Sequence, residues 1–301
     1  MHSDTETGKI RAMKASTTLL ARQPVGLSLR APHLRDLLAL APALGFVEVR
    51  ASDIGAVEGV PLASIKDLAS RWPLAMQVSE IGVSGEIGLV ERPLDEIERM
   101  AGLPLRRLSL PLTPERDPGA LAAVVEVIQS HLGQPVLLEL GQHADALGDT
   151  LKLADLARQT RSRLTLEPDR MLAQAIQRVR SSPTVPATQR QQWQRATALV
   201  LDAVWSLSPS LVGQVRLGGF REPESPQPIL RRSSADRSQR ISPSGWALLR
   251  QALEHLGPVP TALAWDSDLP GFAVLLDEVR LASELMAEVG ADGEEALELD
   301  D

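Results

Sequence analysis

The stretch Val25-Gly26-Leu27-Ser28-Leu29-Arg30 alternates large aliphatic residues with residues that are small, polar or charged. A period of two places these two kinds of residue on opposite faces of a β-strand. Seven further runs repeat the pattern, near residues 47–50, 74–79, 107–110, 136–140, 164–167, 214–217 and 262–266. Each predicted strand therefore has one face for an apolar layer and one polar face.

Segments with helical signals separate these runs. Proline at the start, glycine at the end and apolar residues three or four apart predict helices over 32–43, 61–71, 93–100, 118–132, 145–158, 171–180, 188–207, 243–256 and 272–279. Eight alternations in this order predict an α/β fold, a (β/α)8 TIM barrel. We expect a flexible N-terminus over 1–23, a single barrel domain over 24–287 and an acidic C-terminal tail over 288–301.

Composition narrows the function classes. The chain has no cysteine, which excludes disulfides and thiolate ligands. Seven acids and no bases follow from Glu288 onward, so the rest of a chain of net charge −8 is nearly neutral. A neutral body with three Phe and no Tyr argues against nucleic acid as a partner. No apolar run approaches the roughly 20 residues of a membrane span, so we expect a cytoplasmic protein without a membrane partner.

The polar strand faces must meet inside the barrel, and they carry balanced charge. Four acids and four bases are predicted to point inward: Glu48, Glu139, Glu167, Asp266, Arg30, Arg50, Arg107 and Arg216. Burying one ion alone costs several kcal/mol, so these groups must pair with each other, a ligand or a metal.

Three interpretations of this charge set stay open. One is an ion network. A second is an anion-binding site on Arg30, Arg216, Gly218 and Gly219, because barrels often bind phosphate after strand seven. The third is a metal site on Glu139, His143, Glu167 and Asp169. A loop over 220–242, rich in arginine, is predicted to lie over the same mouth.

Several strings resemble the multinuclear non-heme iron-dependent oxidases, the MNIO family. They are VGLSLR (25–30), HLRDLL (33–38), FVEVRASDIG (46–55), RWPLAMQ (71–77), PVLLELGQHADAL (135–147), QVRLGGF (214–220) and TALAWDSDLPGFAVLLDE (261–278). The resemblance implies a barrel that holds two or three irons and oxidises residues of ribosomally made precursor peptides, usually with a partner protein that presents the peptide.

The iron ligands that the resemblance implies are mostly replaced in this sequence. Gln77, Pro111, Arg216 and Phe220 stand where histidines are expected, Ala264 stands for a glutamate, and Ser52-Asp53 stands for a Glu-Asn pair. Glu139 alone matches a ligand cleanly, while Glu167 and Asp169 lie near the ligands of strand six.

These replacements favour a pseudoenzyme that binds a precursor peptide or a partner protein, without a cofactor; iron would be expected only if the metal site survives. The alternative is an enzyme with altered chemistry that acts on an anionic small molecule or uses a carboxylate-bound metal. Its candidate catalytic residues are Glu139, Glu167 and Asp266.

Overall fold

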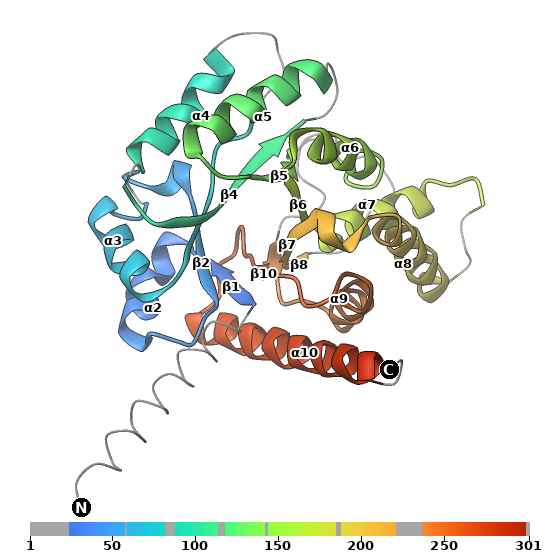
Figure 1. Ribbon diagram of the computed structural model, residues 1–301. Helices are drawn as coiled ribbons and strands as arrows, with labels where there is room; N and C mark the ends of the chain where they lie inside the picture. The colour runs from blue at the N-terminus through green and yellow to red at the C-terminus, as the bar shows by residue number, and fades with distance from the viewer. Residues whose placement is uncertain are drawn as a thin grey trace, which may run out of the picture.

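Eight parallel strands close into a barrel in the order β1-β10-β7-β6-β5-β4-β3-β2 (Figure 1). The computed structural model describes residues 24–57, 59–81, 88–100, 102–113, 118–141, 144–184, 188–220 and 237–298. The barrel strands are β1 (Val25–Ser28), β2 (Phe46–Arg50), β3 (Leu74–Gln77), β4 (Leu105–Leu112), β5 (Leu137–Leu140), β6 (Arg163–Leu166), β7 (Val212–Leu217) and β10 (Thr261–Leu263). The predicted TIM barrel is thus confirmed.

The helices surround this barrel. They are α2 (Leu34–Leu40), α3 (Leu62–Arg71), α4 (Gly88–Arg99), α5 (Pro118–Leu132), α6 (Thr150–Thr160), α7 (Pro168–Arg180), α8 (Gln189–Trp205), α9 (Pro243–Leu256) and α10 (Phe272–Glu298). Short 3-10 turns η1 (Ala31–His33) and η2 (Ala51–Asp53) follow β1 and β2, and η3 (Pro209–Leu211) precedes β7. In the described part of the chain, no helix combines the length and apolar character needed to cross a bilayer.

Several helix boundaries differ from the sequence-based expectation, including α6, which begins at Thr150 and not at residue 145. Helix α4 begins at Gly88 and contains Pro93, which was expected to start it. Helix α7 begins at Pro168, because proline at the first helical position needs no hydrogen-bond partner. Helix α10 continues to Glu298, so most of the segment expected as an acidic tail is helical. After Val279 the buried stripe of α10 continues through Ala282, Leu285, Met286 and Val289, and so reaches the first residues of that segment.

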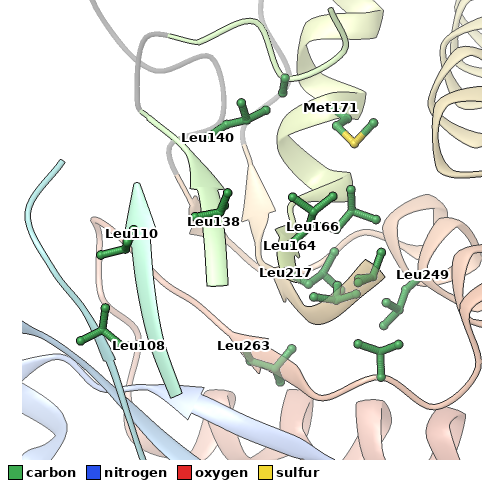
Figure 2. Close-up of a cluster of buried hydrophobic side chains, with 14 of the residues drawn as sticks. Leu108, Leu110, Leu138, Leu140, Leu164, Leu166, Met171, Leu217, Leu249 and Leu263 are labelled. Atoms are coloured by element: carbon green, nitrogen blue, oxygen red, sulfur yellow. The ribbon is translucent and has the colours of Figure 1, made fainter. Parts of the chain in front are cut away.

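The apolar strand faces pack outward against the helices. Leu108, Leu138 and Leu164, on neighbouring strands, are all buried, and Figure 2 shows them with Leu166 and Leu217 in one apolar layer. Leu249 of α9 and Met171 of α7 close this layer from the helix side (Figure 2). Helix α10 packs against α9 and β1, as Figure 1 shows. The alternation read from the sequence thus directs each apolar face to the core.

The bottom of the barrel interior is filled by one aromatic ring. Phe46 forms a small buried cluster with Ala75 and Ala262. A methyl group on Gly26 would lie 2.6 Å from the Phe46 ring, so only glycine fits beside it. The guanidinium of Arg107 lies 4.7 Å from the ring centre, a cation–π contact. Arg107, expected among the inward charges, is therefore a floor residue next to Phe46.

The long connection between β7 and α9 begins and ends in a small hairpin. Strand β8 (Gly219–Phe220) pairs antiparallel with β9 (Arg237–Gln239). The predicted loop 220–242 thus returns to its starting point at the barrel mouth. Its residues 221–236, including Arg221, Arg231 and Arg232, lie outside the described residues, as do the predicted N-terminus 1–23 and residues 299–301.

Candidate functional site

The centre of the barrel is occupied by the guanidinium of Arg216 on β7. Its side chain is 2% exposed and donates to Glu48 of β2 at two points, from Nη2 to Oε2 at 2.9 Å and from Nε to Oε1 at 3.2 Å. Its Nη1 donates to Oε1 of Glu139 on β5. Arg216 therefore joins two carboxylates that come from opposite sides of the barrel.

Two amide side chains complete this cluster. Gln214 donates from Nε2 to Glu48 Oε2 at 2.8 Å, and Gln77 donates from Nε2 to Glu139 Oε1 at 2.7 Å. Gln77, at the position where the resemblance implies a histidine, thus serves as a hydrogen-bond donor to Glu139.

The pKa values of Glu48 and Glu139 are shifted in opposite directions. Burial opposes ionisation of Glu48, but the charge of Arg216 and its hydrogen bonds outweigh burial and lower the pKa of Glu48. Burial raises the pKa of Glu139 to about 7, and the nearby charges of Glu167 and Glu48 add to this effect against the attraction of Arg216. Among the described residues, Glu139 Oε2 has no hydrogen-bond partner. Glu139 is therefore the proton-accepting group of the cluster.

A second guanidinium, Arg237 of β9, lies among the remaining acids. Its Nε donates to Asp169 Oδ2 at 2.7 Å, and its Nη2 donates to Glu167 Oε1 at 2.6 Å. Its Nη1 lies 3.4 Å from Asp266 Oδ2. Arg237 thus comes from the long connection after β7 and contacts three carboxylates of the barrel mouth.

Arg170 of α7 contacts Glu167 and the backbone that follows β5. It donates from Nη1 to Glu167 Oε2 at 3.2 Å and to the carbonyl oxygen of Leu140 at 2.9 Å. Its Nη2 donates to the carbonyl oxygens of Gly141 and Ala144. Arg170 therefore fixes the chain after β5 relative to Glu167.

The pKa directions follow from these contacts. Burial opposes ionisation of Glu167, yet the charges of Arg237 and Arg170 lower its pKa to about 2. Burial likewise opposes ionisation of Asp266, whose pKa is lowered to about 2 by Arg237 and Arg50. For Asp169 burial prevails over Arg237 and raises the pKa. Arginine charge thus lowers the pKa of Glu167 and of Asp266, whereas burial outweighs it at Asp169.

Arg30 and Arg50 form the rim of the mouth. Arg50 donates from Nη2 to Asp266 Oδ1. Arg30 makes two long contacts, from Nη1 to Asp53 Oδ2 at 3.4 Å and from Nη2 to the carbonyl oxygen of Asp266 at 3.5 Å. Both side chains are about one quarter exposed, Arg30 at 22% and Arg50 at 25%. The rim is therefore the part of the charge network that solvent can enter.

The structure brings most of the sequence-predicted residues together at this mouth. The candidate catalytic acids Glu139, Glu167 and Asp266 lie there with Asp169, Arg30 and Arg216. The candidate ligand His143 lies outside the described residues. Of the other histidines, His33 and His255 bind backbone carbonyl oxygens of Pro270 and Leu207.

Arg216, Gly218 and Gly219, which were expected to bind an anion, contact other parts of the chain. The Gly218 amide donates to Asp169 Oδ2 at 3.1 Å. Gly219 pairs with Gln239 in the hairpin. All three guanidinium nitrogens of Arg216 donate to Glu48 or Glu139. These groups therefore serve the chain's own carboxylates and strands.

The described residues do not fit a cluster of irons. The space between the carboxylates holds guanidinium groups, which stay charged at every relevant pH and repel a metal cation. No three His, Asp, Glu or Cys residues of the described ranges converge in a way that could hold a metal ion. The ion-network interpretation thus describes the arrangement of these side chains.

Two residues of the site, Arg237 and Arg170, were not among the candidates predicted from the sequence. Arg237 lies in an arginine-rich connection in which no spacing distinguishes it from Arg231, Arg232 or Arg240. Arg170 carried a usable signal, because it follows Glu167 by three residues at the start of a helix, where such pairs are neighbours.

Comparison with known proteins supports the resemblance read from the sequence. Residues 197–287 match the family described as the RiPP precursor modification enzyme MbnB/TglH/ChrH. A UPF0276 protein of Chromobacterium violaceum is 26% identical over 292 residues, which cover 89% of this chain and 95% of that protein. A UPF0276 protein of Acaryochloris marina is 23% identical over 88% of this chain and 95% of its own length.

Solved structures share the fold. A xylose isomerase domain containing protein of Salmonella typhimurium aligns with a TM-score of 0.55 at 14% identity, over 92% of this chain and 97% of that chain. The IOLI protein, solved with a bound zinc atom, aligns with a TM-score of 0.55 at 12% identity, over 89% of this chain and 98% of its own. At such identities the likeness concerns the barrel alone.

Proposed function

We propose that this chain, of which residues 197–287 match the RiPP precursor modification enzyme family MbnB/TglH/ChrH, is a member of that family in which arginines replace the iron centre. It acts as an iron-independent binding or scaffold partner in the maturation of ribosomally made peptides. The peptide, or the protein that carries it, binds at the barrel mouth.

One observation carries this proposal: two guanidinium groups lie where cations are needed to balance buried acids. Arg216 bridges Glu48 and Glu139, and Arg237 bridges Glu167 and Asp169. Removing a metal while keeping its carboxylates would leave uncompensated buried charge, which costs several kcal/mol. Arginine supplies that charge as part of the chain, so the barrel folds without the metal.

Metal analysis of the purified protein tests the loss of iron. We expect far less than one iron per chain after expression in iron-rich medium, and the same after anaerobic addition of ferrous iron and desalting. The Glu139→Ala variant should have the same iron content as the unaltered chain. Stoichiometric iron that disappears in Glu139→Ala would overturn the proposal.

Peptide binding tests the scaffold role. The probes are fluorescently labelled peptides encoded by short reading frames next to this gene, measured by anisotropy with and without a chelator. We expect binding of such a peptide to be equal in both conditions. Binding that needs iron, or no binding of any neighbouring peptide, contradicts the scaffold role.

A second candidate function is supported by one observation on Glu139. Its pKa of about 7 suits a general acid or base, and its Oε2 has no partner among the described residues. An altered enzyme acting on an anionic small molecule would use this group. Phosphorylated metabolites that raise the melting temperature of the unaltered protein, but not of Glu139→Gln, would favour this candidate over the scaffold.

A further inference from the structure

We infer that Arg30 and Arg50 form a site for a single carboxylate group of a bound peptide, at the rim of the barrel mouth. The inference rests on the proposed function for the peptide as the source of the carboxylate. The site itself follows from the placement of the two guanidiniums, from their unused donors and from the local charge.

The strand register places the two arginines side by side. Ser28 of β1 lies opposite Glu48 of β2 in the parallel ladder, so Arg30 and Arg50 come two residues later at the same level. Inward-facing positions recur every second residue, which sends both side chains to the same mouth. Both make contact with Asp266, from Arg30 to its carbonyl oxygen and from Arg50 to its carboxylate.

Each guanidinium keeps a donor without a hydrogen-bond partner among the described residues. These donors are Nη1 of Arg30 and Nε of Arg50, both sheltered from solvent as single atoms. The contact of Arg30 Nη1 with Asp53 Oδ2, at 3.4 Å, is an ion pair at the long end of the range. A sheltered donor without an acceptor is costly, so a carboxylate at the rim gains two hydrogen bonds once each guanidinium rotates its covered donor outward.

The local charge favours an anion of a single negative charge. Asp266 is shared between Arg50 and Arg237, and Asp53, at 3.4 Å, is the only carboxylate among the described residues that forms an ion pair with Arg30. Burial and the positive charge of Arg50 lower the pKa of Arg30 against the attraction of Asp53 and Asp266. A dianion such as phosphate would meet Asp53 and Asp266 at close range. A carboxylate is a planar monoanion with two acceptor oxygens, which suits paired guanidinium donors.

The side chains are accessible from outside, unlike the inner arginines. Arg30 and Arg50 are 22% and 25% exposed, whereas Arg216 and Arg237 are 2% and 7% exposed. A carboxylate can therefore contact the exposed part of each rim guanidinium, and rotation of that guanidinium presents its covered donor without opening the two inner clusters. The rim site and the iron replacement are thus separate properties of the mouth.

Three synthetic peptides of one neutral sequence, each acetylated at the N-terminus, test the inference by isothermal titration calorimetry on the full chain. One ends in a free carboxylate, one ends in an amide, and one ends in an amide but carries a single central aspartate. The peptide that ends in an amide and has no aspartate should bind at least about tenfold more weakly than one of the other two peptides. This corresponds to a difference of about 1.4 kcal/mol in binding free energy. Which of the two binds better tells whether the carboxylate is terminal or on a side chain.

The variants Arg30→Gln and Arg50→Gln should each weaken binding of the better peptide about tenfold and leave the iron content unchanged. Arg35→Gln, on the exposed face of α2, is the matched control and should bind normally. Circular dichroism confirms that each variant is folded. Four results would overturn the inference. They are equal binding of all three peptides, no binding of any peptide, unchanged binding in both rim variants, and inorganic phosphate that binds more strongly than the better peptide. None of these results bears on the absence of iron, which metal analysis tests alone.

Discussion

Arg237 donates to both carboxylate oxygens of Asp169, from Nε to Oδ2 at 2.7 Å and from Nη2 to Oδ1 at 3.3 Å. The two residues come from β9 and from the first turn of α7, so this fork joins the end of the long connection after β7 to the barrel wall. The Asp169 Oδ2 atom also accepts the amide of Gly218 at 3.1 Å. One buried carboxylate thus positions both ends of that connection.

Replacing Arg237 should therefore loosen the connection as well as destabilise the fold. Arg237→Gln leaves Glu167 and Asp169 with less compensating charge, and loss of one partner of a buried pair costs about 3–5 kcal/mol. We expect a drop of this size in the free energy of unfolding by urea. Hydrogen exchange at the Asp266 amide, which donates to the carbonyl oxygen of Arg237 at 2.7 Å, should be faster.

Arg240→Gln is the control for this variant. Arg240 follows the same hairpin but is 58% exposed and faces the exposed Asp277 at 3.5 Å. Exposed pairs contribute up to about 1 kcal/mol, so a small effect is expected. Equal effects of the two substitutions would contradict a special role of Arg237.

The central arginine should be more costly to remove than any surface arginine. Arg216→Met keeps the volume and removes the charge, which leaves Glu48 and Glu139 buried without their cation. We expect a loss of about 3–5 kcal/mol in urea unfolding. Adding Glu48→Gln to this variant should recover part of the loss, because the uncompensated acid is then neutral. Arg158→Gln, in an exposed pair with Asp155, should lose no more than about 1 kcal/mol.

The sequence allowed prediction of the barrel and of most charges in it. Period-two alternation places Arg216, Glu48 and Glu139 on inward faces whatever the loops do, since each lies on a strand. Arg237 could not be selected, because its position depends on where a long connection returns. The partner of Gln77 was likewise hidden, since a glutamine carries no charge that must be balanced.

Helix ends were predicted less well for a physical reason. Proline favours the first turn of a helix but does not forbid a turn before it, as Pro93 within α4 shows. The acidic composition after Glu288 indicated a tail, while the apolar stripe through Met286 and Val289 kept α10 packed on its neighbours. Packing of an amphipathic face thus continues α10 past Val279 into the first residues of that segment.

The protonation of Glu139 should make stability depend on pH between its two pKa values. Its pKa is about 7 in the fold, against an ordinary value of 4.5. The folded state therefore binds a proton more tightly than the unfolded state, and the resulting stability is present below about pH 4.5 and lost as the pH rises towards 7. Relative to Glu139→Gln, which cannot ionise, the unaltered protein should lose stability across this window.

Urea unfolding of both proteins at several pH values across this window measures the effect. Glu254→Gln, on the exposed side of α9, serves as the matched control for removing a glutamate. A difference for Glu139→Gln that stays constant with pH, or that has the opposite sign, would show that Glu139 is ionised throughout.

The floor of the barrel offers a test that involves no charge. In Gly26→Ala the added methyl group would lie 2.6 Å from three carbons of the Phe46 ring, which is held between Arg107 and the alanines at 75 and 262. Forcing an extra methyl group into a packed interior costs about 1–3 kcal/mol. We expect a loss of this size in urea unfolding, and none for Gly271→Ala, where no atom lies within 4 Å of the added group. The double variant Gly26→Ala with Phe46→Leu should be more stable than the sum of the single losses predicts, because the shorter side chain makes room for the methyl group. Additive losses would mean that the ring does not set the requirement for glycine at this position.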